Sequence, residues 1–266
     1  MSKFTDQEYL KNDQYRDASN LNARLELHRR FSVNSYGWFP WIFDILETLP
    51  TPARVLELGC GPGDMWKECT DRIPDGWSIT LSDLSEGMID AAWRNLVVTG
   101  RAFKYEQIDA QSIPCPDETF DIVIANHMLY HVPDRPKALK EIRRVLKTDG
   151  YLVATTVGDG HLAEIREWRK RIDLGTDVLS FDNPFTLDNG IEQIAPFFSQ
   201  VEIKRYEDNL RVTEVEPLMA YIRSGFRDEE LSELVQEKLH QELESMLAQK
   251  GEIFITKDSG LFLAVK

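Results

Sequence analysis

Apolar and polar positions along this chain follow two periods, and the change between them separates predicted strands from predicted helices. Five short apolar or alternating stretches predict strands, at 55–58, 79–83, 103–108, 120–125 and 151–157. Between them, apolar positions recur every three or four residues, and Ser85 and Asp134 can cap the helices that follow. Strands separated by helices of this length predict right-handed crossovers and a parallel sheet.

The segments on either side of this region are less regular. Leu21, Leu25 and His28 have helical spacing, and an aromatic stretch follows at 31–41, so we expect helices and loops over the mouth of the core. Residues 201–206 alternate like a strand, and 228–249 predict an amphipathic helix that ends at Gly251. The stretches 253–256 and 261–265 predict a closing hairpin.

These patterns divide the chain into four parts. We interpret 1–50 as an N-terminal helical lid and 51–157 as the core that binds a ligand. Residues 158–200 are interpreted as a cap or substrate segment. Residues 201–266 are expected to complete the sheet, with helices inserted between its strands.

The first predicted strand ends in Glu57-Leu58-Gly59-Cys60-Gly61-Pro62-Gly63. Strand, glycine turn and helix start together present bare backbone N–H groups and a helix N-terminus to a ligand. The dinucleotide fingerprint needs a third glycine at the sixth position, where this chain has Asp64. An acid at the strand end attracts a cation such as an α-ammonium and repels a pyrophosphate. The turn therefore favours a zwitterionic ligand that carries a nucleoside.

The turn, two further acids at strand ends and the motif 126–131 together resemble the class I (Rossmann-like) S-adenosylmethionine-dependent methyltransferases of the small-molecule type. The resemblance covers 55–157 and is weaker elsewhere. It implies a doubly wound α/β fold with a mostly parallel seven-stranded sheet, its last strand antiparallel, under a helical cap. It also implies S-adenosyl-L-methionine as the cofactor, with Asp83 on the ribose hydroxyls and Asp109 at the adenine amine. The cofactor-binding residues that it implies are Tyr15, Glu57, Gly59, Cys60, Gly61, Asp83, Leu84, Met88, Asp109, Ala110, Gln111 and Asn126.

The residue types suit these roles on chemical grounds as well. A carboxylate accepts two hydroxyl donors at once, as a ribose diol requires. Methionine is soft and packs on a ring face, as Met88 would on the adenine. Parallel sheets of this kind bind ligands at the carboxyl ends of their strands, where the glycine turn, Asp83 and Asp109 are expected.

Methyl transfer is an in-line displacement, in which the protein aligns two reactants and can remove a proton. His127, just after the fourth strand, is the leading candidate for a base, and His161 is the second; for both, a place in the pocket wall is the alternative. His131 is interpreted as scaffold. His28 and His240 are expected to be structural or exposed. The sequence predicts no metal site.

Several aromatic residues outside the core are expected either in the core packing or in the wall of an apolar acceptor pocket. They are Trp38, Phe39, Trp41, Trp168, Phe181, Phe185, Tyr221 and Phe226.

Charge and composition narrow the partners. The formal net charge of -14 disfavours nucleic acid and anionic membranes, and no apolar run approaches a membrane span. Three cysteines without zinc spacing fit a reduced cytoplasm. We therefore expect a cytoplasmic enzyme, monomer or homodimer, that methylates an O or N atom of a small molecule. The alternatives are a protein or tRNA methyltransferase, a non-catalytic regulatory protein that binds the cofactor, and, more remotely, an NAD-dependent dehydrogenase.

Overall fold

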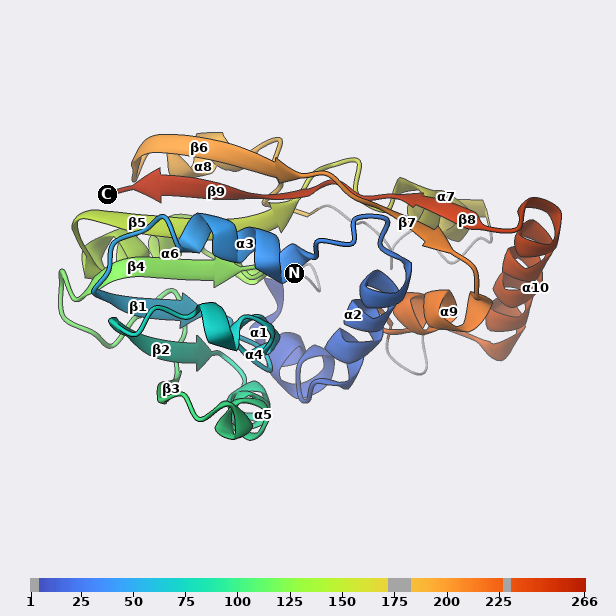
Figure 1. Ribbon diagram of the computed structural model, residues 1–266. Helices are drawn as coiled ribbons and strands as arrows, with labels where there is room; N and C mark the ends of the chain where they lie inside the picture. Colours follow the sequence, from blue (N-terminus) through green and yellow to red (C-terminus); the bar gives the residue numbers. More distant parts are fainter. Residues whose placement is uncertain (1–4, 172–182, 227–230) are drawn as a thin grey trace.

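The computed structural model describes residues 5–171, 183–226 and 231–266. Its main body is a seven-stranded sheet in the order β3-β2-β1-β4-β5-β9-β6 (Figure 1). Only β9 runs against its neighbours, β5 and β6. The predicted doubly wound sheet with an antiparallel last strand is confirmed. Its strands are β1 (Ala53–Leu58), β2 (Trp77–Asp83), β3 (Phe103–Gln107), β4 (Phe120–Asn126), β5 (Leu146–Val157), β6 (Ser199–Tyr206) and β9 (Ser259–Val265).

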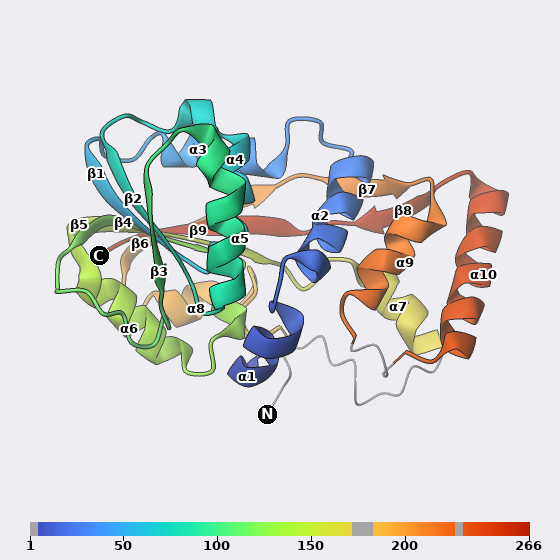
Figure 2. The ribbon, with the colours of Figure 1, turned by 90° about the horizontal axis from the view of Figure 1, so that it is seen from below.

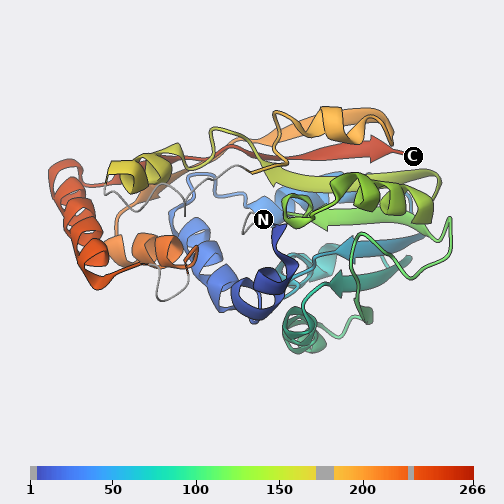
Figure 3. The ribbon, with the colours of Figure 1, turned by 180° about the vertical axis from the view of Figure 1, so that it is seen from behind.

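Helices cover both faces of this sheet, because the central strands are apolar on both sides. One face packs against α3 (Trp38–Leu46), α4 (Asp64–Glu68) and α5 (Glu86–Leu96), and the other against α6 (Arg135–Val145) and α8 (Gly190–Ile194) (Figures 1 and 3). The predicted caps are present: the Ser85 hydroxyl accepts from the Met88 N–H, and Asp134 accepts from the Lys137 N–H. These three layers hold the carboxyl ends of the parallel strands at one edge.

A second, smaller unit lies beyond that edge. It contains a two-stranded ribbon and four helices around their own apolar cluster, and we call it the cap (Figures 1 and 2). The ribbon continues two strands of the main sheet, because β7 follows β6 and β8 precedes β9. The elements of the cap are β7 (Asn209–Val212), β8 (Ile253–Thr256), α2 (Ser19–Phe31), α7 (Ala163–Arg171), α9 (Val215–Arg223) and α10 (Glu233–Lys250).

The prediction of a closing hairpin is wrong. β8 pairs with β7, whereas β9 pairs with β5 and β6. The short connection between β8 and β9 suits a hairpin turn, but both strands find partners far away in the sequence. The predicted helix at 228–249 is α10, which begins at Glu233 and ends at Gly251 with a left-handed φ of 77°. Residues 227–230 lie outside the described residues.

The two parts of the N-terminal segment lie in different places in the fold. The helix α1 (Gln7–Tyr9) and the π-helical turn η2 (Leu10–Gln14) lie beside the cavity at the carboxyl edge, and α2 follows them into the cap. In contrast, α3 packs on the face of the sheet beside Trp66 and belongs to the core layers. Likewise α8, within the segment expected to be cap, packs on the opposite face of the sheet. No helix among the described residues is long and apolar enough to span a membrane.

Candidate active site

Strand register brings the predicted site residues to one level of the sheet. Leu58 at the end of β1 pairs with Ser82 of β2 and with Ala125 of β4. The next residue on each strand is therefore Gly59, Asp83 or Asn126, at the same edge. Three segments remote in sequence thus meet side by side where parallel sheets bind ligands.

A cavity of about 1730 Å³ opens at this edge, between the sheet, the N-terminal segment and the cap. It is large enough for a nucleoside cofactor together with a second small molecule. Of the residues predicted to bind cofactor or act as a base, only Gln111 lies outside its lining. The cavity is lined by Tyr15, Glu57, Gly59, Cys60, Gly61, Asp83, Leu84, Met88, Asp109, Ala110, Asn126, His127 and His161.

The glycine turn brings its backbone close to the following segment of the site. Gly59 has a φ of 70°, and a Cβ there would lie 2.8 Å from the Cβ of Met128. Any side chain at this position would therefore be strained and would also clash. The turn leaves its backbone exposed to the cavity, as the sequence predicts.

Glu57 is buried beneath the turn, with an exposed fraction of 2%. The Trp66 indole N–H donates to one of its carboxyl oxygens, and the Asn126 amide donates to the other at 2.7 Å. Burial raises the pKa of Glu57 to about 7, although these two hydrogen bonds oppose that rise. A cation bound beside Glu57 would favour its ionised form.

Asp83 and Asp109 lie on the same side of the cavity. Asp83 accepts backbone hydrogen bonds from Gly61 at 3.0 Å and from Ser85 at 2.9 Å, and burial raises its pKa. Burial acts in the same direction on Asp109, but hydrogen bonds from Gln111 and Gln7 outweigh it and lower the pKa. Gln111 is thus a support for Asp109, since its N–H and its amide both donate to that carboxylate.

The N-terminal segment closes this side of the cavity. The Ser85 hydroxyl donates to the Tyr15 carbonyl at 2.7 Å, and the Tyr15 hydroxyl lies 2.9 Å from the Nε2 atom of His131. A Cβ at Gly87 would lie 2.0 Å from the Arg16 carbonyl oxygen, so only glycine lets these two segments approach so closely. Tyr15 therefore joins the N-terminal segment to the segment that follows β4.

Asn126 and His127 follow the end of β4 in the cavity wall. The Oδ1 atom of Asn126 is buried and accepts no hydrogen bond from the described residues, while its amide is committed to Glu57. His127 has a left-handed φ of 48°, and its backbone N–H donates to the Thr155 hydroxyl at 2.9 Å. Burial, with a contribution from Lys257, lowers the pKa of its imidazole to about 4. His127 is therefore neutral at pH 7.

Two more histidines line the cap side of the cavity. The Nδ1 atom of His161 accepts from the Asp258 N–H at 3.2 Å, which places the proton of the neutral ring on Nε2. His161 thus has a hydrogen to donate but no free lone pair to act as a base. His28 lies beside it, with ring centroids 6.3 Å apart, and its buried Nδ1 atom has no partner among the described residues. Burial lowers the pKa of both imidazoles, that of His28 to about 3.

Sequence reasoning missed several residues of the cavity wall. His28, expected to be structural or exposed, lines the cavity, and so do Arg24 and Lys257. The helical spacing of Leu21 and His28 was a usable signal, because Arg24 lies on the same face of that helix. Lys257 gave no signal: it precedes β9 and forms an ion pair with the buried Asp208 at the junction of cap and sheet.

The aromatic residues divide between wall and core. Trp38, Phe39 and Tyr221 line the cavity, and the Trp38 ring lies 5.5 Å from that of His127. Trp168, Phe185 and Phe226 are buried in apolar clusters, and Trp41 packs beside Trp38. Phe181 lies outside the described residues.

Comparison with known proteins identifies what this fold is similar to. Residues 56–154 match the family model described as "Methyltransferase domain". Over 99 residues the chain is 35% identical to the ubiquinone/menaquinone biosynthesis C-methyltransferase UbiE of Xanthomonas oryzae, covering 36% of this chain and 39% of that protein. Over 117 residues it is 34% identical to the malonyl-[acyl-carrier protein] O-methyltransferase of Geobacter sulfurreducens, covering 43% and 42%. The matches therefore span less than half of these relatives.

Solved structures extend the likeness to the fold of nearly the whole chain. The YcgJ protein of Bacillus subtilis matches with a TM-score of 0.59 at 19% identity, covering 86% of this chain and 97% of that one. Phosphoethanolamine N-methyltransferase 2 of Haemonchus contortus, in complex with S-adenosylmethionine, matches with a TM-score of 0.60 at 21% identity. That match covers 100% of this chain and 60% of the other. At these identities the likeness shows the fold alone.

Proposed function

We propose that the whole chain is an S-adenosylmethionine-dependent methyltransferase for a small molecule, because its core at 56–154 is a methyltransferase domain on the class I fold. The observation that carries the proposal is the register that gathers Gly59, Asp83 and Asn126 around one cavity. The acceptor atom is proposed to be oxygen or nitrogen. The two relatives are named as a C-methyltransferase and an O-methyltransferase, so their names do not agree on the acceptor atom. The choice of oxygen or nitrogen therefore depends on the site residues and on the test below.

The residues present fit this cofactor. The unpartnered Asn126 Oδ1 and the adjacent Glu57 offer acceptors to an α-ammonium. The Asp83 carboxylate has lone pairs left after its two backbone bonds, which suit the ribose hydroxyls. Met88 and Leu84 line the same side and would pack on the adenine, with Asp109 at its amine. When bound, S-adenosylmethionine supplies a methyl group on a positively charged sulfur.

The chain would then align the acceptor and exclude water. Trp38 and Tyr221 provide apolar walls, and the Tyr15 segment closes over the opposite side. We propose His127 as the group that receives a proton from the acceptor and His161 as a donor that orients it. An imidazole with a pKa of about 4 is a weak base, so His127 suits an acceptor whose reactive group is itself acidic. The proposal needs no metal.

The function is tested with cofactor labelled in its methyl group. The purified chain is incubated with a panel of small hydroxy, carboxy and amino compounds, and products are identified by mass spectrometry. Labelled product with tightly bound S-adenosylhomocysteine supports the proposal. Cofactor binding without turnover on any acceptor would favour a regulatory binder, and preferential methylation of protein or tRNA would favour a macromolecular substrate. Stronger binding of NADH would contradict the proposal outright.

A first prediction follows for His127. Changing His127→Ala should lower kcat by about tenfold to a hundredfold, because a positioned proton acceptor contributes at least this much. The affinity for S-adenosylhomocysteine, measured by calorimetry, should change less than threefold. Equal losses in turnover and affinity would make His127 part of the pocket wall. His240→Ala, on α10 and outside the lining of the cavity, is the matched control.

A further inference from the structure

Arg24 of α2 is a half-buried guanidinium in the cavity wall. Its Nε donates to the Ser224 hydroxyl at 3.0 Å, and one terminal nitrogen donates to the Ser224 carbonyl at 2.9 Å. The other terminal nitrogen lies 3.4 Å from the Tyr15 hydroxyl. All three partners are uncharged, and no carboxylate among the described residues forms an ion pair with Arg24. A guanidinium carries five N–H groups, so Arg24 has donors beyond these three contacts. Its positive charge has no negatively charged partner among the described residues.

Neighbouring arginines on the same helix show the contrast. Arg29 lies 3.7 Å from a carboxylate oxygen of Asp64, and Arg30 pairs with Glu214 and, at 3.9 Å, with Glu26. These two side chains are exposed, where a partner contributes little, whereas the half-buried Arg24 has no charged partner among the described residues. A charge held away from water without a counter-charge costs free energy. A cavity with such a group in its wall is therefore suited to binding a negatively charged ligand.

The place of Arg24 along α2 indicates which ligand. Leu21, one turn before it, packs over Gly61 of the cofactor turn, where a Cβ would lie 3.3 Å from its methyl group. His28, one turn after it, faces His161 in the cap. The Arg24 guanidinium contacts Ser224, which follows α9 of the cap, and Tyr15 of the N-terminal segment. It therefore lies between the cofactor edge and the chamber bounded by the cap.

We propose that Arg24 binds an anionic group of the methyl acceptor, so that the acceptor is a small organic acid, a carboxylate or a phosphate ester. The inference rests on the proposed function, and it narrows the substrate class. The planar fork of a guanidinium matches the oxygens of either group. The Nδ1 atom of His28, one turn along the same face of α2, has no partner among the described residues and can donate to that acid in the tautomer that carries its proton on Nδ1.

The cofactor contains a carboxylate too, in its methionine part. The same chemistry at Arg24 could therefore come from the cofactor or from the acceptor. The experiment separates these sources by using ligands that contain one or the other.

The binding of matched anionic and uncharged probes is measured by calorimetry, with the chain saturated by S-adenosylhomocysteine. The pairs are benzoate with benzamide and phenyl phosphate with phenol. At least one anion should bind about tenfold or more tightly than its uncharged partner, as expected for a charged hydrogen-bonded pair. Arg24→Gln should reduce that preference to less than twofold and should leave the affinity for S-adenosylhomocysteine within twofold. Arg30→Gln, which removes a guanidinium already paired with Glu214, should leave both unchanged.

Three results would overturn the proposal. The wild-type complex could bind no anion more tightly than its partner, or the preference could survive Arg24→Gln. Alternatively, Arg24→Gln could weaken S-adenosylhomocysteine tenfold while 5′-methylthioadenosine, which has no carboxylate, binds as before. That third result would assign Arg24 to the methionine carboxylate.

Two further experiments distinguish failure of this inference from failure of the proposed function and from failure of the variant to fold. The anion titrations are repeated without cofactor, so that failure of S-adenosylhomocysteine to bind refutes the function while the anion preference is still measured. If Arg24→Gln does not fold, Arg24→Lys takes its place: it keeps the charge without the fork and should retain a weakened preference. A full preference in that variant would contradict a forked contact.

Discussion

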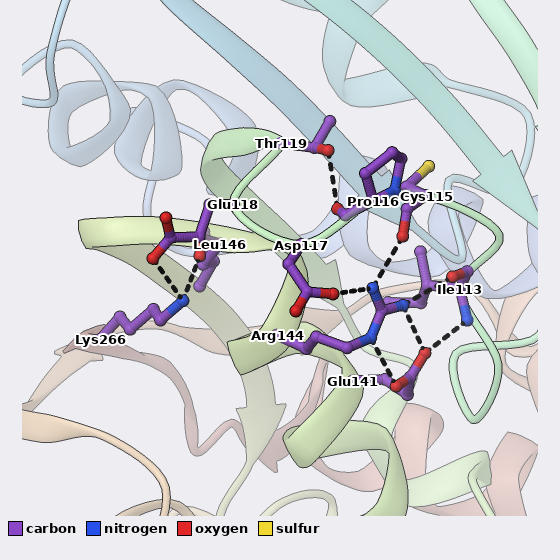
Figure 4. A network of polar contacts seen from close by, with 10 residues as sticks. All are labelled: Ile113, Cys115, Pro116, Asp117, Glu118, Thr119, Glu141, Arg144, Leu146 and Lys266. Carbon is purple, nitrogen blue, oxygen red and sulfur yellow. Dashed lines mark hydrogen bonds and ion pairs between the residues drawn. The ribbon is translucent and has the colours of Figure 1, made fainter.

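Two arginines of this chain differ in what surrounds them. Arg144, on α6, uses all five N–H groups: it meets Glu141 twice and Asp117 once, and the carbonyls of Cys115 and Ile113 once each (Figure 4). These contacts tie the connection between β3 and β4 to α6, away from the cavity. Arg24 faces the cavity with three uncharged contacts and no carboxylate.

The same difference holds for other polar atoms. Within the described part of the chain, four buried side-chain atoms lack a hydrogen-bond partner: His28 Nδ1, Asp64 Oδ2, Asn126 Oδ1 and Tyr206 Oη. The first three belong to residues that line the cavity. Since buried polar groups are nearly always paired, their concentration here marks the surface where a ligand completes the structure.

The largest effect on stability is expected at Arg144. Arg144→Gln should lower the free energy of unfolding by about 2–3 kcal/mol, because Glu141 and two backbone carbonyls lose their donor. Urea denaturation at pH 7 measures this. The affinity for S-adenosylhomocysteine should stay unchanged. Arg143→Gln on the same helix, which loses one bond to the Phe197 carbonyl, should cost less than about 1 kcal/mol. Equal losses at both positions would contradict the role given to the network.

Asp83 should have the next largest effect, on binding. Asp83→Ala should weaken S-adenosylhomocysteine by about 1–3 kcal/mol, the scale of losing hydrogen bonds to a charged group. Isothermal titration calorimetry measures the difference, and Asp90→Ala, at an exposed position of α5, serves as the control. An unchanged affinity would contradict the assignment of Asp83 to the ribose hydroxyls.

Glu57 should make cofactor binding depend on pH. Its folded-state pKa of about 7 lies above the ordinary 4.5, so between these values the folded chain keeps a proton that the unfolded chain has lost. Stability should therefore fall as pH rises through that window, by up to about 1.4 kcal/mol per pH unit. Because an α-ammonium favours the carboxylate, affinity for S-adenosylhomocysteine should instead rise up to about tenfold per unit from pH 5.5 to 7. Glu57→Gln should abolish both slopes; slopes that persist would assign them to another group.

The smallest expected effect is on stability at Arg24. Arg24→Gln should change the free energy of unfolding by less than about 1 kcal/mol, because removal of an unpaired charge offsets the lost bonds to Ser224. Thermal and urea denaturation are compared with Arg30→Gln. A loss of 2 kcal/mol or more would show that Arg24 is a structural residue like Arg144, and this result would contradict our proposal.

Local sequence patterns were sufficient to predict the parallel strands of the sheet and the residues at its carboxyl edge. The periods of the central region, the Ser85 and Asp134 caps and the glycine turn all act over a few residues, so the sequence displays them directly. The partner of β8 does not appear in such patterns, because β7 and β8 are separated by two helices. The hairpin prediction failed for this reason. Likewise α3 looked like part of a lid until its packing against Trp66 was known.

The residues that line the cavity at the strand ends were predicted from the sequence, and those on the cap side were largely missed. Every strand-end residue comes from the regular core, whose spacing is fixed by strand pairing. Arg24, His28 and Lys257 reach the cavity through tertiary packing of the cap, and single-sequence patterns do not contain that information. His161 illustrates a finer limit: its position was predicted, but the Asp258 N–H that fixes its tautomer was not.

The structure of the chain crystallised with S-adenosylhomocysteine tests the central claim most directly. We predict the ribose hydroxyls on Asp83, the α-ammonium against Asn126 Oδ1, and the Arg24 guanidinium still open toward the cap chamber. A nucleoside bound elsewhere, or a methionine carboxylate seated on Arg24, would contradict the account.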